Sequence, residues 1–206
     1  SQVARVLVQR TDRLPNYSIS RDDEIAKTIK ELNLDREFLV KEQTRLKNQL
    51  HRLLHQAYNS EYRSKFKDPF SLKALLYWQS HPLPRKSDEA RSNTFILKNQ
   101  IKRKVKRLLD IRGEIKTIEA ELNVLIKQTN QKLDTLNGCG IALAAKVLAE
   151  IRNIERFKSS SSLAKYAGLC PREKSSGKTF RYIKTKSGNR KLNMAIHRIA
   201  LSQISK

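Results

Sequence analysis

Apolar residues recur at alternating spacings of four and three in two long stretches of the chain. The first stretch runs from Ile25 to Ala57 and the second from Leu97 to Thr129. This heptad period predicts two long helices, each with one apolar seam. The first helix, from about Arg21 to Tyr58, would be roughly 55 Å long and needs a partner. The period fits both an antiparallel coiled-coil hairpin within one chain and seams that pair across a dimer.

The segment between the two seams, residues 59–93, has a different pattern. A short helix is expected from Phe70 to Gln79, and it carries the only tryptophan, Trp78. Prolines at 82 and 84 end this helix, because proline cannot continue one. Two interpretations stay open: a cap that buries aromatic rings against the end of the helix pair, and a dedicated binding surface.

The heptads stop near Asp134, where glycines and small residues take over. A Gly-x-Gly turn, a serine-capped helix that ends at Gly168, a strand at 179–183 and an amphipathic helix at 192–204 are expected after this point. The predicted fold class is therefore mainly α. Long antiparallel coiled-coil helices are followed by a small helical domain with a helix-hairpin-helix-like turn and a short β-hairpin or strand.

Three domains follow from these changes of pattern. Residues 1–16 hold an apolar run that we interpret as the tail of an upstream helix. Residues 17–133 form the coiled-coil region with its capping insertion, and residues 134–206 form the C-terminal module. The chain starts with Ser1 and its only methionine is Met194, so we expect it to be a piece of a longer polypeptide.

The net charge of the chain restricts the chemical classes of partner that it can bind. Lys and Arg number 43 and Asp and Glu 20, a net charge of +23, and +12 of this charge lies in residues 151–206. Such an excess favours a polyanionic partner, either nucleic acid or an anionic membrane face. No apolar run approaches the roughly 20 residues of a membrane span, and no signal peptide is evident. We expect an intracellular, cytoplasmic protein without a membrane partner.

Candidate phosphate contacts are of two kinds. The turn of Gly138 and Gly140 leads into a helix whose free N–H groups could bind a DNA phosphate, although the same turn would also serve only to pack two helices. The basic run at residues 102–107 fits a solvated helix face and a phosphate contact equally.

Two cysteines far apart, Cys139 and Cys170, provide no disulfide framework and no zinc ligand set.

A basic loop at residues 170–178 contains a pair of serines, Ser175 and Ser176. Clustered cations beside a serine suit attack on a phosphodiester, but basic serine and glycine loops more commonly only bind phosphates. The cations that we expect to contact DNA here are Arg172, Lys174, Lys178, Arg181, Lys184, Lys186, Arg190 and Lys191.

The order of these motifs resembles a family of insertion-sequence transposases. Its members combine an N-terminal RuvC-like DEDD nuclease domain with a C-terminal transposase-20 domain, and they include pilin-inverting and bridge-RNA-guided recombinases. The motifs that carry the resemblance are Gly138-Cys139-Gly140, Ala144 to Ile151, Arg156-Phe157-Lys158-Ser159, Leu163 to Pro171, Ser176-Gly177-Lys178 and Lys186-Ser187-Gly188-Asn189.

The resemblance implies a role for individual residues. Ser176, with Ser175 as the neighbouring alternative, would be the nucleophile toward DNA. Four acidic ligands in the nuclease half would hold Mg²⁺, and Asp12, Asp22 and Asp23 do not fit their positions. The chain would begin just after its own metal site. The resemblance also implies a homo-oligomer formed through the coiled coil, and it leaves open whether a guide RNA is a partner.

Three hypotheses remain at this point. The chain is the DNA-binding and catalytic-serine portion of a transposase that cuts and rejoins DNA, or a non-catalytic nucleic-acid-binding module, or a coiled-coil scaffold whose charge only keeps it in solution. The concentration of charge at residues 151–206 makes the scaffold the weakest of the three.

Overall fold

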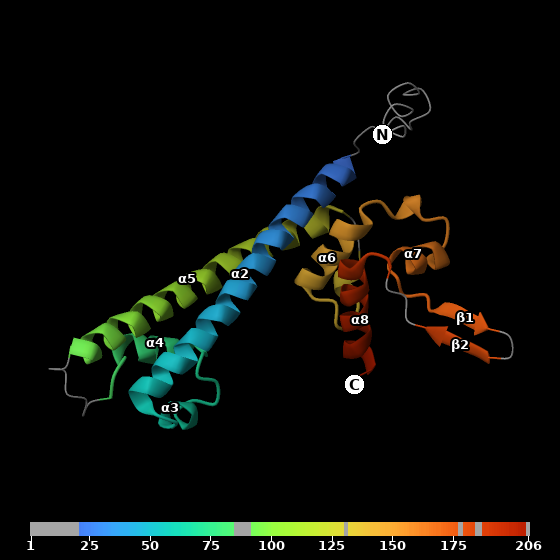
Figure 1. Cartoon of the computed structure of the whole chain (residues 1–206). Helices are drawn as coiled ribbons and strands as arrows, with labels where there is room; N and C mark the ends of the chain where they lie inside the picture. Colours follow the sequence, from blue (N-terminus) through green and yellow to red (C-terminus); the bar gives the residue numbers. More distant parts are fainter. Residues whose placement is uncertain (1–20, 85–91, 130–131, 177–178, 184–186, 205–206) are drawn as a thin grey trace, which may run out of the picture.

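Two long helices form the body of the protein. The structure, a computed structural model, describes residues 21–84, 92–129, 132–176, 179–183 and 187–204. Helix α2 (Arg21–Tyr58) and helix α5 (Ser92–Gln128) lie side by side and run in opposite directions (Figure 1). Ion pairs report the same direction: Arg36 of α2 contacts Glu119, whereas Glu42, further along α2, contacts Arg107, which comes earlier in α5.

The apolar seams predicted from the heptads meet between these helices. Leu46 and Leu50 of α2 are buried, as are Ile101 and Leu108 of α5, and they belong to one apolar cluster. Burial of such leucine and isoleucine side chains is worth about 1.5–3 kcal/mol each, which stabilises helices that would be marginal alone. The seams thus pair within one chain. Association of several chains stays a prediction.

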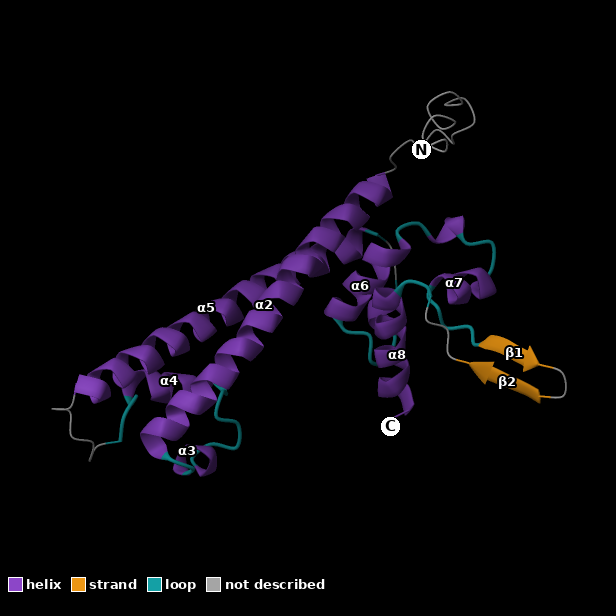
Figure 2. Ribbon diagram, viewed as in Figure 1, coloured by secondary structure: helices purple, strands orange, loops and turns teal. Residues whose placement is uncertain are grey.

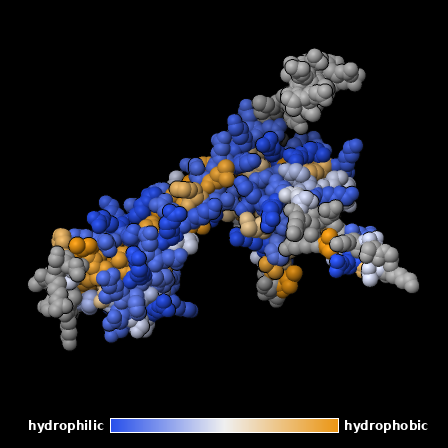
Figure 3. Space-filling model, viewed as in Figure 1, coloured by the Kyte–Doolittle hydropathy of each residue, from blue (hydrophilic) through white to orange (hydrophobic). Residues whose placement is uncertain are grey.

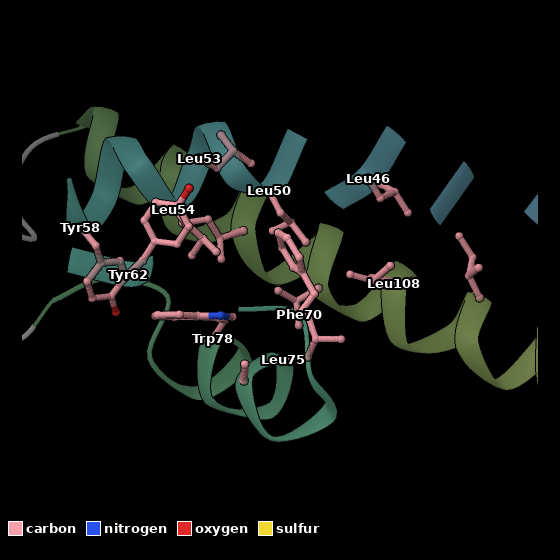
Figure 4. Packing of buried hydrophobic residues seen from close by; sticks show 14 of the residues in the cluster. Leu46, Leu50, Leu53, Leu54, Tyr58, Tyr62, Phe70, Leu75, Trp78 and Leu108 are labelled. Carbon is pink, nitrogen blue, oxygen red and sulfur yellow. The ribbon is translucent and has the colours of Figure 1, made fainter. Parts of the chain in front are cut away.

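A small aromatic cap closes one end of the helix pair. Helices α3 (Glu61–Ser64) and α4 (Leu72–Ser80) fold back beneath it, and Trp78 is fully buried (Figure 4). The Trp78 indole donates a hydrogen bond to the carbonyl of Pro69 at 2.9 Å, and the Tyr58 hydroxyl donates one to the carbonyl of His81 at 2.6 Å. Burial, and to a lesser extent Tyr77, raise the pKa of Tyr58 to about 12. These contacts agree with the capping interpretation, and a binding role for the same segment stays a prediction.

The C-terminal module is built around one central helix. Its elements are η2 (Leu133–Thr135), α6 (Ile141–Ile151), η3 (Ile154–Arg156), α7 (Ser160–Tyr166), β1 (Arg172–Ser176), β2 (Thr179–Ile183) and α8 (Arg190–Ile204). The small residues of α6 let neighbouring helices approach it closely. Ala144 and Ala145 pack with Ile29 and Leu122 of the long helices, while Val147 packs with α8. Among the described residues, strands occur only in the β1–β2 hairpin (Figure 2).

One ion pair joins the module to the long helices. The ammonium group of Lys146, on α6, lies 2.6 Å from a carboxylate oxygen of Glu37, on α2, and the Lys146 residue is only 9% exposed. Partial burial raises the pKa of Glu37, but the hydrogen bond and charge of Lys146, helped by Lys191 and Lys41, outweigh it and leave that pKa below its usual value. This pair joins α6 to α2 in addition to the apolar contacts of Ala144 and Ala145 with Ile29.

The surface of the helix pair is mainly hydrophilic on the face seen in Figure 3. In the described part of the chain, no helix combines the length and the apolar character needed to cross a membrane. The domain boundary predicted near Asp134 remains a prediction, since the buried cluster around Ala144 includes residues on both sides of it.

Candidate nucleic-acid interface

The two serines lie on a β-hairpin that extends away from the helices (Figure 1). Strand β1 pairs antiparallel with β2, with Arg172 opposite Ile183 at one end and Ser176 opposite Thr179 at the other. Residues 172–176 were expected to belong to a loop, and this expectation is wrong. Their strand form depends on backbone pairing with β2, because the sequence Arg-Glu-Lys-Ser-Ser has little strand preference of its own.

The register divides the hairpin into two faces. Successive residues of a strand alternate between faces, and residues directly opposite each other share one. The face that we call the basic face contains positions 172, 174, 176, 179, 181 and 183. The face that we call the aromatic face contains positions 173, 175, 180 and 182. Ser176 therefore shares a face with three of the predicted DNA-binding cations, whereas Ser175 is on the opposite face.

The basic face places two positive residues directly opposite each other. Lys174 is the cross-strand partner of Arg181, and Arg181 is exposed. Arg172 lies two residues before Lys174 on the same strand and face. This face is chemically suited to a phosphate.

Two glycines hold the ends of the hairpin together, and we call the contact between them the hairpin base. Gly168 precedes the hairpin and Gly188 follows it, with φ of +69° and +103°. A methyl group added to Gly168 would lie 2.3 Å from the carbonyl oxygen of Ser187, and one added to Gly188 would lie 2.6 Å from the nitrogen of Gly168. The backbone N–H of Asn189 donates to the carbonyl of Tyr166 at 2.8 Å across the same contact.

Asn189 also organises the polar side chains around the hairpin base. Its side-chain oxygen accepts hydrogen bonds from the backbone N–H groups of Lys191 and Leu192, which caps α8. Its side-chain amide donates to a carboxylate oxygen of Glu150 at 2.6 Å and to the hydroxyl of Tyr166 at 3.3 Å. From the sequence alone, Asn189 was recognised only as part of a motif. No spacing pattern predicted these hydrogen-bond partners.

Arg156 completes this cluster from the other side. Its guanidinium carbon lies 4.7 Å from the ring centres of both Phe157 and Tyr166. The hydrogen bond from Asn189, together with the hydrogen bond and charge of Arg156, lowers the pKa of Tyr166 despite the opposing effects of partial burial and Glu150. The exposed guanidinium is held by two rings, so its position beside the hairpin base is defined.

The glycine turn before α6 has a mainly structural explanation. Gly138 has φ of +80°, and a methyl group added to it would lie 2.3 Å from the Cβ atom of Ser202 on α8. Gly140 is the N-cap of α6, and nothing lies within 4 Å of a methyl group added there. Gly138 thus packs two helices together, whereas Gly140 leaves the helix N-terminus open. Phosphate binding by this turn stays a prediction.

The remaining predicted cations are distributed more widely. Arg190 and Lys191 are exposed at the start of α8. Ser202, which contacts the glycine turn, is 12 residues further along α8, a rise of about 18 Å. The turn and the hairpin are therefore separate places on the module. Lys178, Lys184 and Lys186 lie outside the described residues.

In the basic run on α5, the side chains have different surroundings. Lys102, Arg103 and Lys106 are exposed, whereas Arg107 contacts Glu42 at 3.0 Å and Glu114 at 2.9 Å. Hydrogen bonding to Glu42 contributes most to raising the pKa of Arg107. Arg107 is therefore engaged within the helix pair, and its three neighbours remain candidates for phosphate contact.

No metal cluster accompanies the hairpin in the part of the chain that the structure describes. No group of three or more His, Cys, Asp or Glu side chains there could hold a metal ion. A cavity of about 430 Å³ lies between α6 and α8, but side chains such as Val147, Ile151, Ile196 and Ile199 make its lining largely apolar. The predicted Mg²⁺ has no ligand set among these residues, and its place in a nuclease half stays a prediction.

Comparison with known proteins agrees with the C-terminal motifs. Residues 130–206 match the family model described as Transposase IS116/IS110/IS902 family. A comparison with curated proteins gave no match. The matched residues include the hairpin, its base and the glycine turn, so the resemblance drawn from these motifs is confirmed. Over residues 130–206 the chain is therefore similar to the IS116/IS110/IS902 family of insertion-sequence transposases.

Proposed function

We propose that this chain is the DNA-binding and nucleophile-bearing part of a transposase, and that Ser176 attacks the scissile phosphate. The observation that carries the proposal is the hairpin register, which puts Ser176 on one face with Arg172, Lys174 and Arg181. The family match of residues 130–206 supports the reaction class. Ser175 is less suited to this role, because its face contains Glu173 instead of a cation.

The proposed reaction is a transesterification at one phosphodiester of the DNA. The Ser176 hydroxyl oxygen forms a bond to phosphorus while the bond to the leaving nucleotide oxygen breaks. The serine proton passes to a base, and the leaving oxygen takes up a proton. A hydroxyl of a second DNA end then attacks the phosphoserine linkage, which rejoins the DNA and restores the serine. The three cations stabilise the charge that develops on the phosphoryl oxygens.

Among the described residues, no group of three or more His, Cys, Asp or Glu side chains could hold a metal ion. We therefore assign the base, and the Mg²⁺ site that the family resemblance implies, to a DEDD nuclease half. This division makes a second candidate function worth testing: a module that only binds DNA. The paired cations Lys174 and Arg181 would serve binding as well as they serve catalysis.

Covalent capture of DNA tests the proposal. The 206-residue chain is incubated with labelled DNA and Mg²⁺, with and without a DEDD nuclease half, and protein–DNA adducts are separated under denaturing conditions. We expect an adduct only when both halves are present. Ser176→Ala should abolish it, whereas Ser175→Ala, the matched control on the opposite face, should retain it. An adduct that survives Ser176→Ala would assign the nucleophile to another residue.

Failure to form any adduct would be informative if DNA binding is measured in parallel. Each phosphate contact releases a counterion, so a chain that uses the three basic-face cations should lose affinity steeply as salt rises. Salt-sensitive binding without an adduct would favour the binding module. The proposal also includes a homo-oligomer, which light scattering tests. It further includes a guide RNA, which the same binding assay tests with RNA in place of DNA.

A further inference from the structure

We propose that the aromatic face of the hairpin stacks on unpaired bases of DNA through Phe180 and Tyr182. This inference rests on the proposed function, since it assumes that DNA is the ligand of the hairpin. It adds a second contact to that site: the basic face would bind phosphates while the aromatic face binds bases. The preferred ligand is then single-stranded DNA, in which the faces of the bases are accessible.

More than half of the surface of each ring residue is exposed. Phe180 is 58% exposed and Tyr182 is 65% exposed, and all five residues of β2 are exposed. Their ring centres are 5.1 Å apart with an angle of 86° between the planes. The rings therefore contact each other edge to face, and much of their surface remains available to a planar ligand.

The neighbours of these rings favour a base over a protein surface. The cross-strand partner of Phe180 is Ser175, and that of Tyr182 is Glu173. The two rings are thus the only apolar side chains on this face of the paired strands, far fewer than the apolar centre of a stable protein interface needs. Base stacking needs only the rings, because every base presents an aromatic face.

The charges on the two faces determine which part of the DNA each would contact. The carboxylate of Glu173 is exposed on the aromatic face and would repel a phosphate there. Arg172, Lys174 and Arg181 occupy the other face, where a phosphate would be attracted. A hairpin divided in this way fits a strand whose backbone passes along one face while its bases turn toward the other. Duplex DNA cannot offer this arrangement unless its bases separate.

The experiment uses the full 206-residue chain and a fluorescein-labelled single-stranded DNA of 20 nucleotides. A second oligonucleotide of the same length carries abasic sites throughout its centre, so it keeps the phosphates and lacks the bases. Affinities are measured by fluorescence anisotropy for the unaltered chain, for Phe180→Ala and for Tyr182→Ala. The matched control is Phe38→Ala, which removes a ring of similar exposure, 67%, from α2.

Each hairpin variant should bind the normal strand at least about fivefold more weakly, the lower end of what loss of one stacked ring costs. The same variants should bind the abasic strand as the unaltered chain does, and Phe38→Ala should bind both strands normally. Phe180→Trp and Tyr182→Phe should retain affinity, because they keep a ring at each position. Circular dichroism confirms that the variants are folded.

Equal affinity of the hairpin variants and the unaltered chain for the normal strand would overturn the inference. An equal loss of affinity on both strands would also overturn it, because the rings would then act without bases. A variant that changes the oligomeric state but not DNA affinity would assign this face to a protein contact. The proposed function fails separately, when the unaltered chain shows no salt-sensitive DNA binding at all.

Discussion

Replacing Gly168 with alanine should destabilise the C-terminal module strongly, because the hairpin base has no room for a methyl group. The new Cβ atom would lie 2.3 Å from the carbonyl oxygen of Ser187, which is backbone and cannot rotate away as a side chain can. The φ of +69° would also place alanine in the left-handed region. Any relaxation has to separate two chain segments that the hydrogen bond from Asn189 to Tyr166 joins.

The size of the effect follows from these two contributions. An alanine in the left-handed conformation costs about 1–2 kcal/mol. Forcing extra atoms into a filled site costs typically about 1–3 kcal/mol. The free energy of unfolding of the module should therefore fall by about 2–5 kcal/mol. Gly113→Ala provides an internal control with the opposite sign, since Gly113 lies within α5 and nothing is within 4 Å of an added methyl group. That change should stabilise its helix by about 0.5–1 kcal/mol.

Urea unfolding followed by circular dichroism at 222 nm measures both variants. Trp78 fluorescence, recorded on the same samples, reports the cap at the other end of the helix pair and shows whether the loss is confined to the module. The reasoning would be refuted if Gly168→Ala unfolded at the same urea concentration as the unaltered chain while Gly113→Ala gave its expected gain. The two glycine backbones would then not be in contact in solution.

Two further predictions concern partly buried ionisable groups. Burial, and then the charge of Arg63, lower the pKa of His51 against the smaller effect of Asp68, so the folded cap favours neutral histidine. The unfolded chain takes up this proton first, so the cap should lose stability as pH falls through about 6.5 in urea titrations read by Trp78. His51→Gln should remove much of that dependence. Lys146→Ala should cost about 1–3 kcal/mol because it leaves the partly buried carboxylate of Glu37 without its partner. Adding Glu37→Gln to Lys146→Ala should cost less than the sum of the single changes, and strict additivity would show that the pair contributes no coupling energy.

The long helices were predictable because the heptad spacing of their apolar residues is repeated many times. The heptads predicted a helix from about Arg21 to Tyr58, and α2 has these bounds. Arg36 is a polar residue within this pattern, and it forms an ion pair with Glu119 on the facing helix. The strand at 179–183 was also found, because its aromatic and β-branched residues favour extended structure.

The candidate site was less predictable, since it depends on contacts between distant residues. The five residues of β1 have weak strand preference, so only their pairing with β2 reveals which face each occupies. Asn189, Glu150 and Tyr166 come from three separate elements, and no periodicity relates them. A glycine at position 138 was compatible with both a phosphate contact and a tight turn, and the structure shows that its positive φ and the position of Ser202 exclude a side chain there.

The length of α2 has a consequence for how the two ends of the molecule are related. Ile29 belongs to the cluster beneath the C-terminal module, and Leu54 belongs to the cluster beneath the aromatic cap. These residues are 25 positions apart on one uninterrupted helix, a rise of about 37 Å. Ile118 of α5 packs against both clusters, so the second helix braces the first. The helix pair therefore sets a fixed spacing between the aromatic cap and the C-terminal module.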